Sequence, residues 1–261
     1  MRIPFIASLL GLLPLACHAD VDFGGHISLG LQRENVQEFG TQDNHLLTEH
    51  GRLPLINAAL ELTAERLRVQ FALRHARGEL HYDGKTSAGT SVSSETRYRE
   101  TRTGFIAALR SYAELEALLG VEQEDRYRDI QGVGSVRGLT ERYRFRWLAA
   151  GLGWRHDGKR GPWQVSALWL RSFSSRQSVE SAGYIDYNSF EGGRLRGYRF
   201  EALLPVTRAG KVSFALQPGF EYFDIARSAD VPWYRNGVLN GSIAQPETHR
   251  WTASLMLAAS W

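Results

Sequence analysis

Ten segments of this chain alternate apolar and polar residues, which is the side-chain period of a β-strand with one apolar face. The last segment shows the pattern plainly: Trp251, Leu255, Leu257 and Trp261 share one parity, and small or polar residues fill most of the other. This repetition limits the chain to an all-β fold. The ten segments cover residues 21–32, 56–64, 67–75, 101–109, 113–122, 142–154, 163–171, 195–206, 212–223 and 250–261.

Short and long connections alternate between these segments. Four are short, at residues 65–66, 110–112, 156–162 and 207–211, and five are long and polar, at residues 33–55, 76–100, 123–141, 172–194 and 224–249. Every long connection therefore falls at one end of the sheet, which is typical of an outer-membrane barrel with short periplasmic turns and long extracellular loops. After the N-terminal region no apolar run reaches 18 residues, so no transmembrane helix is predicted.

We therefore predict an all-β fold: a transmembrane up-and-down antiparallel β-barrel of about ten strands, located in the bacterial outer membrane. Unpaired backbone groups in hydrocarbon cost several kcal/mol, so the last strand must pair with the first. Aromatic residues favour the membrane interfaces. We expect an inner girdle of Phe23, Trp154, Trp163 and Trp261 and an outer girdle of Tyr143, Trp169, Tyr198, Tyr222 and Trp251.

The C-terminal segment resembles the assembly signal of Gram-negative outer-membrane barrels, an alternating last strand that ends in an aromatic residue. Trp251, Leu255, Leu257 and Trp261 carry this resemblance. It implies that the barrel-assembly machinery recognises the chain during insertion. Pro218 falls inside the ninth segment and cannot donate a ladder hydrogen bond, so we expect either a bulge there or a strand that ends early.

The N-terminus has the three parts of a secretory signal peptide: a positive charge at Arg2, an apolar stretch over residues 3–16 and a small-x-small cleavage site at residues 17–19. We therefore divide the chain into a cleaved signal peptide, residues 1–19, and one barrel domain, residues 20–261. Lipidation of Cys17 is an alternative with a weaker motif, because Pro14 lies three residues before it. Cys17 is the only cysteine, so the mature chain has neither a disulfide nor a thiol for catalysis or metal binding.

The polar parity of the segments should face the barrel interior. A ten-stranded barrel is only slightly wider than the eight-stranded barrels that side chains fill, so charges inside it must be paired or hydrated. We expect a plugged lumen, with Glu122 paired to Arg142 or Arg144; a small diffusion channel through the same charges is the alternative. The predicted lumen charges are Glu61, Arg68, Arg74, Glu114, Glu116, Glu122, Arg142, Arg144, Arg146, Arg199, Glu201 and Glu221.

Four residues would serve a hydrolase at the outer mouth: His81 and Asp83 just beyond the third segment, Asp224 beyond the ninth and His249 before the tenth. Outer-membrane aspartyl proteases of the omptin family have a similar strand number and loop rhythm, with an Asp pair facing an Asp-His pair across the mouth. The chain has no Asp-x-Asp motif after a strand segment and no clear Asp-x-His motif opposite it, so this resemblance extends only to the plan of the barrel.

His26 and Ser28 resemble the His-x-Ser pairing of the small lipid A deacylases. Both side chains should face the lumen, whereas acyl chains lie outside the barrel. A hydrogen-bonded lumen histidine is therefore the favoured interpretation of His26.

These patterns favour a non-enzymatic outer-membrane barrel, without cofactor or metal, whose five long loops serve surface interaction or envelope integrity. Arg97, Arg99 and Arg102 are expected near the outer rim, where guanidinium groups can bind lipopolysaccharide phosphates. A net charge of +3 without a basic run argues against a nucleic-acid partner. An omptin-like protease or other hydrolase at the mouth is the alternative function.

Overall fold

The computed structural model describes residues 21–41, 44–85, 89–111 and 114–261. The predicted signal peptide and Ala113 of the fifth segment lie outside the described residues. Within the described ranges, no helix is long and apolar enough to cross a bilayer. The described residues form the strands β1 (Val21–Phe39), β2 (His45–Ala64), β3 (Leu67–Lys85), β4 (Ser91–Arg110), β5 (Leu115–Ile130), β6 (Leu139–Gly158), β7 (Gly161–Ser181), β8 (Ile185–Glu191), β9 (Leu195–Ala209), β10 (Val212–Ile225), β11 (Val231–Arg235), β12 (Val238–Ile243) and β13 (Glu247–Ser260).

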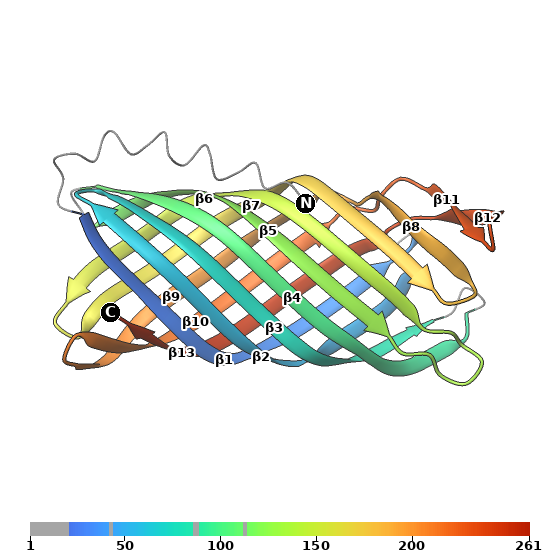
Figure 1. Cartoon of the computed structure of the whole chain (residues 1–261), viewed down its shortest axis with the longest axis horizontal. Coiled ribbons are helices and arrows are strands. Elements are labelled where there is room, and N and C mark those ends of the chain that lie inside the picture. Colours follow the sequence, from blue (N-terminus) through green and yellow to red (C-terminus); the bar gives the residue numbers. More distant parts are fainter. Residues whose placement is uncertain (1–20, 42–43, 86–88, 112–113) are drawn as a thin grey trace.

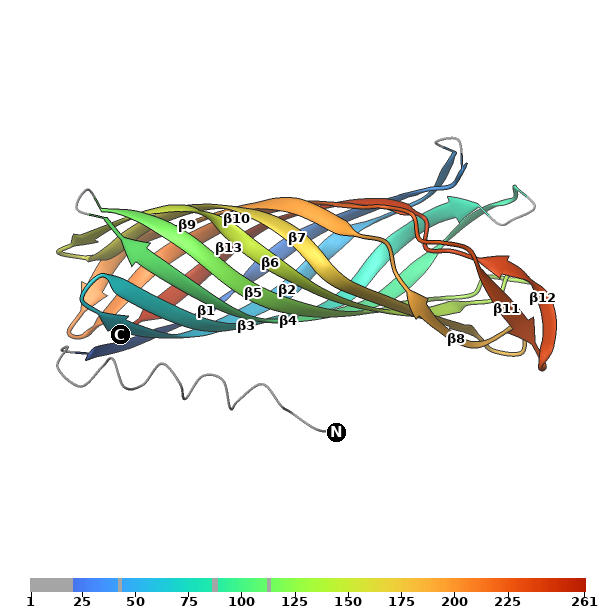
Figure 2. The same ribbon diagram turned by 90° about the horizontal axis from the view of Figure 1, so that it is seen from above.

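Ten of the strands close into one antiparallel barrel, in the cyclic order β1-β2-β3-β4-β5-β6-β7-β9-β10-β13 (Figures 1 and 2). β13 pairs with β1 from Ser260 opposite His26 to Glu247 opposite Phe39. This pairing confirms the prediction that the last strand meets the first and leaves the barrel without an open edge. We name the two ends by their connections: the turn end carries the short hairpins that follow β2, β4, β6 and β9, and the loop end is the opposite one.

The barrel strands extend further toward the loop end than the sequence segments predict. Residues 33–39, 45–55, 76–85, 91–100 and 123–130 are all strand, although they were expected to be loop. β7 also continues to Ser181 and pairs there with β8, while β11 and β12 form a separate hairpin (Figure 2). The prediction of five long loops is therefore wrong in extent. In these extensions both faces carry polar residues, so the hydrogen-bonded ladder continues where the hydrophobic alternation ends.

The outer wall toward the turn end carries the predicted apolar residues. Leu29, Leu60, Leu119 and Leu257 are all exposed there, which is the arrangement expected of a lipid-facing belt. The four predicted inner-girdle aromatics also face outward. Four members of the predicted outer girdle lie in one continuous cross-strand row, with Trp169 opposite Tyr198, Tyr198 opposite Tyr222 and Tyr222 opposite Trp251.

The two faces of β6 are reversed relative to the prediction. Tyr143, Phe145 and Trp147 are buried in the interior, whereas Arg142, Arg144 and Arg146 are exposed on the outer wall. Tyr143 is therefore not a girdle residue. Toward the loop end the outer wall is polar, and bulky side chains fill the bore. An apolar face of a strand therefore marks the interior in that region, whereas nearer the turn end it marks the lipid face.

Pro218 lies within β10, which continues through it to Ile225. Pro218 is opposite Leu255 of β13, but the ladder between β10 and β9 is interrupted from Leu216 to Gly219. The strand thus continues through the proline and keeps its pairing with β13 there. The interruption on the β9 side accommodates the missing N–H group.

Candidate functional site: the charge network in the barrel interior

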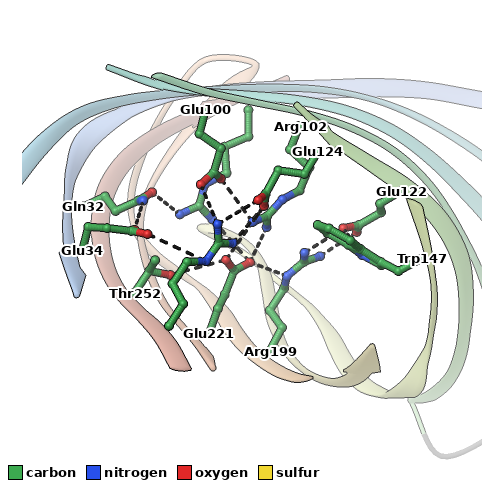
Figure 3. Close-up of polar contacts among 12 residues, drawn as sticks. Gln32, Glu34, Glu100, Arg102, Glu122, Glu124, Trp147, Arg199, Glu221 and Thr252 are labelled. Carbon is green, nitrogen blue, oxygen red and sulfur yellow. Dashed lines mark hydrogen bonds and ion pairs between the residues drawn. The ribbon is translucent and has the colours of Figure 1, made fainter. Parts of the chain in front are cut away.

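Two ion pairs cross the full width of the barrel. Arg102 of β4 donates hydrogen bonds to both carboxylate oxygens of Glu221 of β10 (Figure 3). Arg250 of β13 donates to both oxygens of Glu124 of β5, at 2.7 and 2.9 Å. The strands in each pair lie halfway around the ten-stranded cycle from one another. These side chains therefore bridge opposite walls and occupy the bore.

Glu122 anchors a second group of contacts beside these bridges (Figure 3). It accepts hydrogen bonds from Arg199 at 2.6 and 2.7 Å and from the indole N–H of Trp147 at 3.0 Å. Arg199 also donates to Glu221 at 2.6 Å, and the guanidinium of Arg102 lies 5.3 Å from the centroid of a Trp147 ring. Trp147 is fully buried, so an aromatic ring closes the space between the ion pairs. We call this cluster the central network; it comprises Glu34, Glu100, Arg102, Glu122, Glu124, Trp147, Arg199, Glu221 and Arg250.

Nearer the loop end, one arginine holds three carboxylates. Arg128 lies 2.5 Å from Glu38, 3.0 Å from Glu49 and 2.9 Å from Glu141. The hydroxyl of Tyr143 donates to Glu141 at 3.0 Å, and all five side chains are buried. This cluster is a second group of buried charges inside the bore, closer to the outer mouth.

Toward the turn end the interior opens into a cavity of about 650 Å³, which ends at the central network. Four of its lining charges are paired with one another: Arg68 contacts Glu116 at 2.5 Å and Glu61 at 3.1 Å, and Arg155 contacts Glu61 at 2.7 Å. These two arginines are already matched by carboxylates and are therefore not available to bind an anion.

Buried carboxylates outnumber buried arginines in the described part of the chain. Nine glutamates but only seven arginines are buried. Charges of one sign that exceed their partners in a desolvated interior are neutralised by a pKa shift. Burial raises the pKa of Glu141 to about 7, and the neighbouring Glu38 and Glu49 act in the same direction against Arg128.

The structure places most of the predicted lumen charges inside the barrel. Glu61, Arg68, Arg74, Glu116, Glu122, Arg199, Glu201 and Glu221 line the interior. Glu114 lies instead at the turn before β5, 2.9 Å from His156.

The predicted roles of Arg142, Arg144 and Arg146 in the lumen are wrong, because all three point outward. The predicted pairing of Glu122 with Arg142 or Arg144 is wrong for the same reason; Arg144 pairs on the outer wall with Asp125 at 2.6 Å. Arg102, expected at the outer rim, is buried in the central network.

Sequence reasoning missed ten of the buried charges. Most of them lie in strand extensions that were expected to be loop, whereas Arg102 and Arg250 lie inside predicted segments and were not assigned to the lumen. The missed members are Glu34, Glu38, Glu49, Glu100, Arg102, Glu124, Arg126, Arg128, Glu141 and Arg250. A signal was present: Glu122, Glu124, Arg126 and Arg128 continue one parity, and a strand extended through them would have placed all four inside.

The four candidate hydrolase residues form two separate pairs on the outer wall. His81 lies 3.2 Å from Asp83 on β3, and His249 on β13 lies 4.0 Å from Asp224 on β10. β2 and β1 lie between β3 and β13, so the structure does not bring the pairs together. His26 contacts Asn57 at 3.1 Å, not Ser28, which donates to Gln217 at 2.7 Å.

Three residues of the assembly motif lie on the outer face of β13, at the seam of the barrel, and Trp261 directly follows this strand. Leu255, Leu257 and Trp261 are exposed, and Trp251 is half-buried. The backbone of Trp261 exchanges two hydrogen bonds with Gly25, at 3.1 and 3.2 Å. The terminal aromatic residue is thus tied to the first strand, and its side chain stands at the edge of the apolar belt.

A second cluster of arginines surrounds the outer wall just beyond the apolar belt. Four pairs lie directly opposite one another on neighbouring strands: Arg33 with Arg52, Arg77 with Arg99, Arg144 with Arg176, and Arg171 with Arg196. All eight side chains are exposed. Like charges that face each other across strands destabilise a sheet. In two of the four pairs a carboxylate already contacts one arginine: Asp125 contacts Arg144, and Asp224 contacts Arg196.

No family model and no curated protein sequence matches the chain. Among solved structures, the outer membrane protease OmpT from Escherichia coli is similar, with a TM-score of 0.59 and 9% identity over 94% of this chain and 97% of that one. The translocator domain of the autotransporter NalP from Neisseria meningitidis has a TM-score of 0.43 and 9% identity over 97% and 93%. Identities this low bear on the fold and leave the activity open. The chain has the ten-stranded up-and-down fold of a Gram-negative outer-membrane β-barrel.

Proposed function

We propose that this protein is a non-conducting, non-enzymatic barrel that binds lipopolysaccharide phosphates and supports surface interaction or envelope integrity from the extension above the membrane. The observation that carries the proposal is the set of buried ion pairs between opposite walls, at which the cavity ends. The barrel therefore acts through its outer surface and its loop end rather than through its lumen.

The free-energy cost of separating the buried ion pairs supports a lumen that does not conduct. Four side chains of these bridges are almost fully buried and pair with one another: Arg102, Glu124, Glu221 and Arg250. Removing one partner from a buried pair costs about 3–5 kcal/mol, because the remaining charge is left without compensation. Movement of a solute past the central network would have to break several such pairs together.

The opposed arginine pairs support the phosphate-binding part. They begin directly after the apolar belt: on β1 Arg33 follows Leu31, and on β2 Arg52 precedes Pro54. This is the level at which lipopolysaccharide phosphates would stand. An arginine fork binds phosphate through paired, charge-assisted hydrogen bonds, and one phosphate between two guanidinium groups would relieve their repulsion.

Planar-bilayer recording tests the closed lumen. The folded protein should show no stepwise conductance, whereas the double variant Arg102→Ala/Glu221→Ala, which deletes both sides of one bridge, should leak. The control variant Lys159→Gln lies in the turn between β6 and β7, leaves the bore unchanged and should behave as the parent. Discrete conductance steps from the parent protein would contradict the proposal.

Thermal unfolding in detergent tests the lipid contact. Bisphosphorylated lipid A should raise the unfolding temperature of the parent, and dephosphorylated lipid A should not. The variant Arg33→Gln/Arg52→Gln should lose part of this response. Lys159→Gln/Arg160→Gln, which removes the same charge from an exposed turn at the opposite end, should keep it. Equal responses from the two variants would count against a specific arginine site.

Absence of hydrolase activity is tested by following peptide cleavage in outer-membrane fractions. The proposal expects the same background cleavage from the parent and from a variant in which His81, Asp83, Asp224 and His249 are alanine. Cleavage by the parent that this variant lacks would establish the hydrolase instead.

A further inference from the structure

Three metal-ligand side chains meet on the outer wall at the seam between β10 and β13. Asp224 of β10 lies directly opposite His249 of β13, and Glu247 precedes His249 by two residues on the same strand face. One ligand atom from each residue lies within 4.8 Å of the other two. His249 Nε2 is 3.3 Å from a Glu247 oxygen and 4.0 Å from Oδ1 of Asp224.

We propose that Asp224, Glu247 and His249 bind a divalent transition-metal ion of the zinc type. Zinc holds imidazole nitrogen at about 2.0–2.1 Å and carboxylate oxygen at about 2.0–2.2 Å. Donor atoms around such an ion are separated by about 3.3 Å in a tetrahedral arrangement, so the observed separations need only small side-chain rotations. The imidazole ligand favours zinc, copper or nickel over magnesium or calcium, which prefer oxygen ligands alone.

The surroundings orient two of the ligands. Arg196 holds Oδ2 of Asp224 through Nε, at 2.7 Å, which leaves Oδ1 directed toward His249. The rings of Phe39 and Tyr222 lie 5.1 and 6.4 Å from the imidazole and restrict its rotation. Partners that fix a ligating carboxylate or imidazole in this way strengthen metal binding.

The charge of the cluster also fits a dication. Two carboxylates face a single guanidinium, so the cluster is left with one uncompensated negative charge. His249 and Glu247 are partly exposed, with 37% and 44% of their side-chain surfaces open, so an ion can enter from outside. Asp224 and His249 lie two residues beyond Tyr222 and before Trp251, respectively, on the loop-end side, so the ion would stand outside the apolar belt.

Other histidine–carboxylate contacts in the chain provide matched controls. His156 lies 2.9 Å from Glu114 at the turn end, with similar exposure. Among the described residues, however, only Asp224, Glu247 and His249 gather three possible ligands within this distance. The inference rests on the third ligand and not on an isolated pair.

Isothermal titration of the folded, chelator-treated protein with zinc chloride in detergent tests the site. We expect one equivalent to bind, with an affinity at least ten times lower in Asp224→Asn/His249→Ala and unchanged in Glu114→Gln/His156→Ala. The side chains of Asp224, Glu247 and His249 are all partly exposed. Migration on unheated gels verifies that each variant is folded. Glu247→Gln, a single neutral replacement, should weaken binding with less disturbance of the wall.

Three results would overturn the site: no zinc binding by the parent, equal binding by the parent and Asp224→Asn/His249→Ala, or equal loss in both double variants. Magnesium chloride should give no binding isotherm at the zinc concentration used. Magnesium binding as tight as that of zinc would refute the assigned ion class. The outcome is independent of the lumen and arginine experiments, because no residue is shared with them.

Discussion

The variant Glu141→Gln tests whether the excess of buried carboxylates makes the barrel sensitive to pH. Glu141 of β6 lies beyond the apolar belt and is buried against Arg128, Glu38, Glu49 and Tyr143. Its pKa is raised from 4.5 to about 7. The folded protein therefore keeps this proton up to about pH 7, whereas the unfolded chain releases it near pH 4.5.

The sign and size of the effect follow from this difference. Between pH 4.5 and 7 the folded state binds one more proton than the unfolded state, so the free energy of unfolding falls as the pH rises. One pKa unit corresponds to about 1.4 kcal/mol, so this single group should contribute a loss of about 3 kcal/mol across the window. Glutamine has the shape of the protonated carboxyl but no charge, and its oxygen can still accept from Tyr143.

Urea unfolding in detergent, followed by tryptophan fluorescence from pH 4.5 to 8, measures the effect. The parent should lose about 1.4 kcal/mol per pH unit more than Glu141→Gln over the window. At pH 8 the free energy of unfolding should accordingly be higher for Glu141→Gln than for the parent. This difference should shrink as the pH falls toward 4.5. Glu79→Gln, an exposed residue on the outer wall of β3, should follow the parent at every pH. A pH slope that is identical in the parent and Glu141→Gln would refute the reasoning.

Three further predictions concern the central network and the seam. Arg250→Met should lower the free energy of unfolding by about 3–5 kcal/mol, because it leaves buried carboxylates unpaired, and Arg250→Met/Glu124→Met should lose less than that in the same urea assay. Trp261→Ala should reduce the folded fraction after refolding, because the indole leaves the apolar edge at the β1–β13 seam, and semi-native gel electrophoresis measures this fraction. The folded parent should migrate differently with and without boiling; identical migration would argue against a closed barrel.

The sequence by itself determined the architecture of the membrane-spanning half. Alternation in segments such as residues 21–32 and 250–261 marks a strand with one lipid face, and hydrocarbon forbids an open edge. The number of such segments predicts the number of strands. Closure of β13 on β1, the apolar belt and the position of Trp261 follow from the lipid face and the forbidden edge. Glu116, Glu122, Arg199 and Glu221 could be placed inside from parity alone.

Only the tertiary structure decided what lies beyond the belt. There polar residues occur on both faces of a strand, so residues 123–130 carry no apolar alternation, and the aromatic face of β6 could not be assigned to lipid or bore. The partners across the bore, such as Arg102 with Glu221 and Arg250 with Glu124, are distant in sequence and meet only because the barrel closes. Local patterning indicates which side of a strand is buried in lipid, whereas the choice among buried charges depends on which opposite walls the closed cylinder brings together.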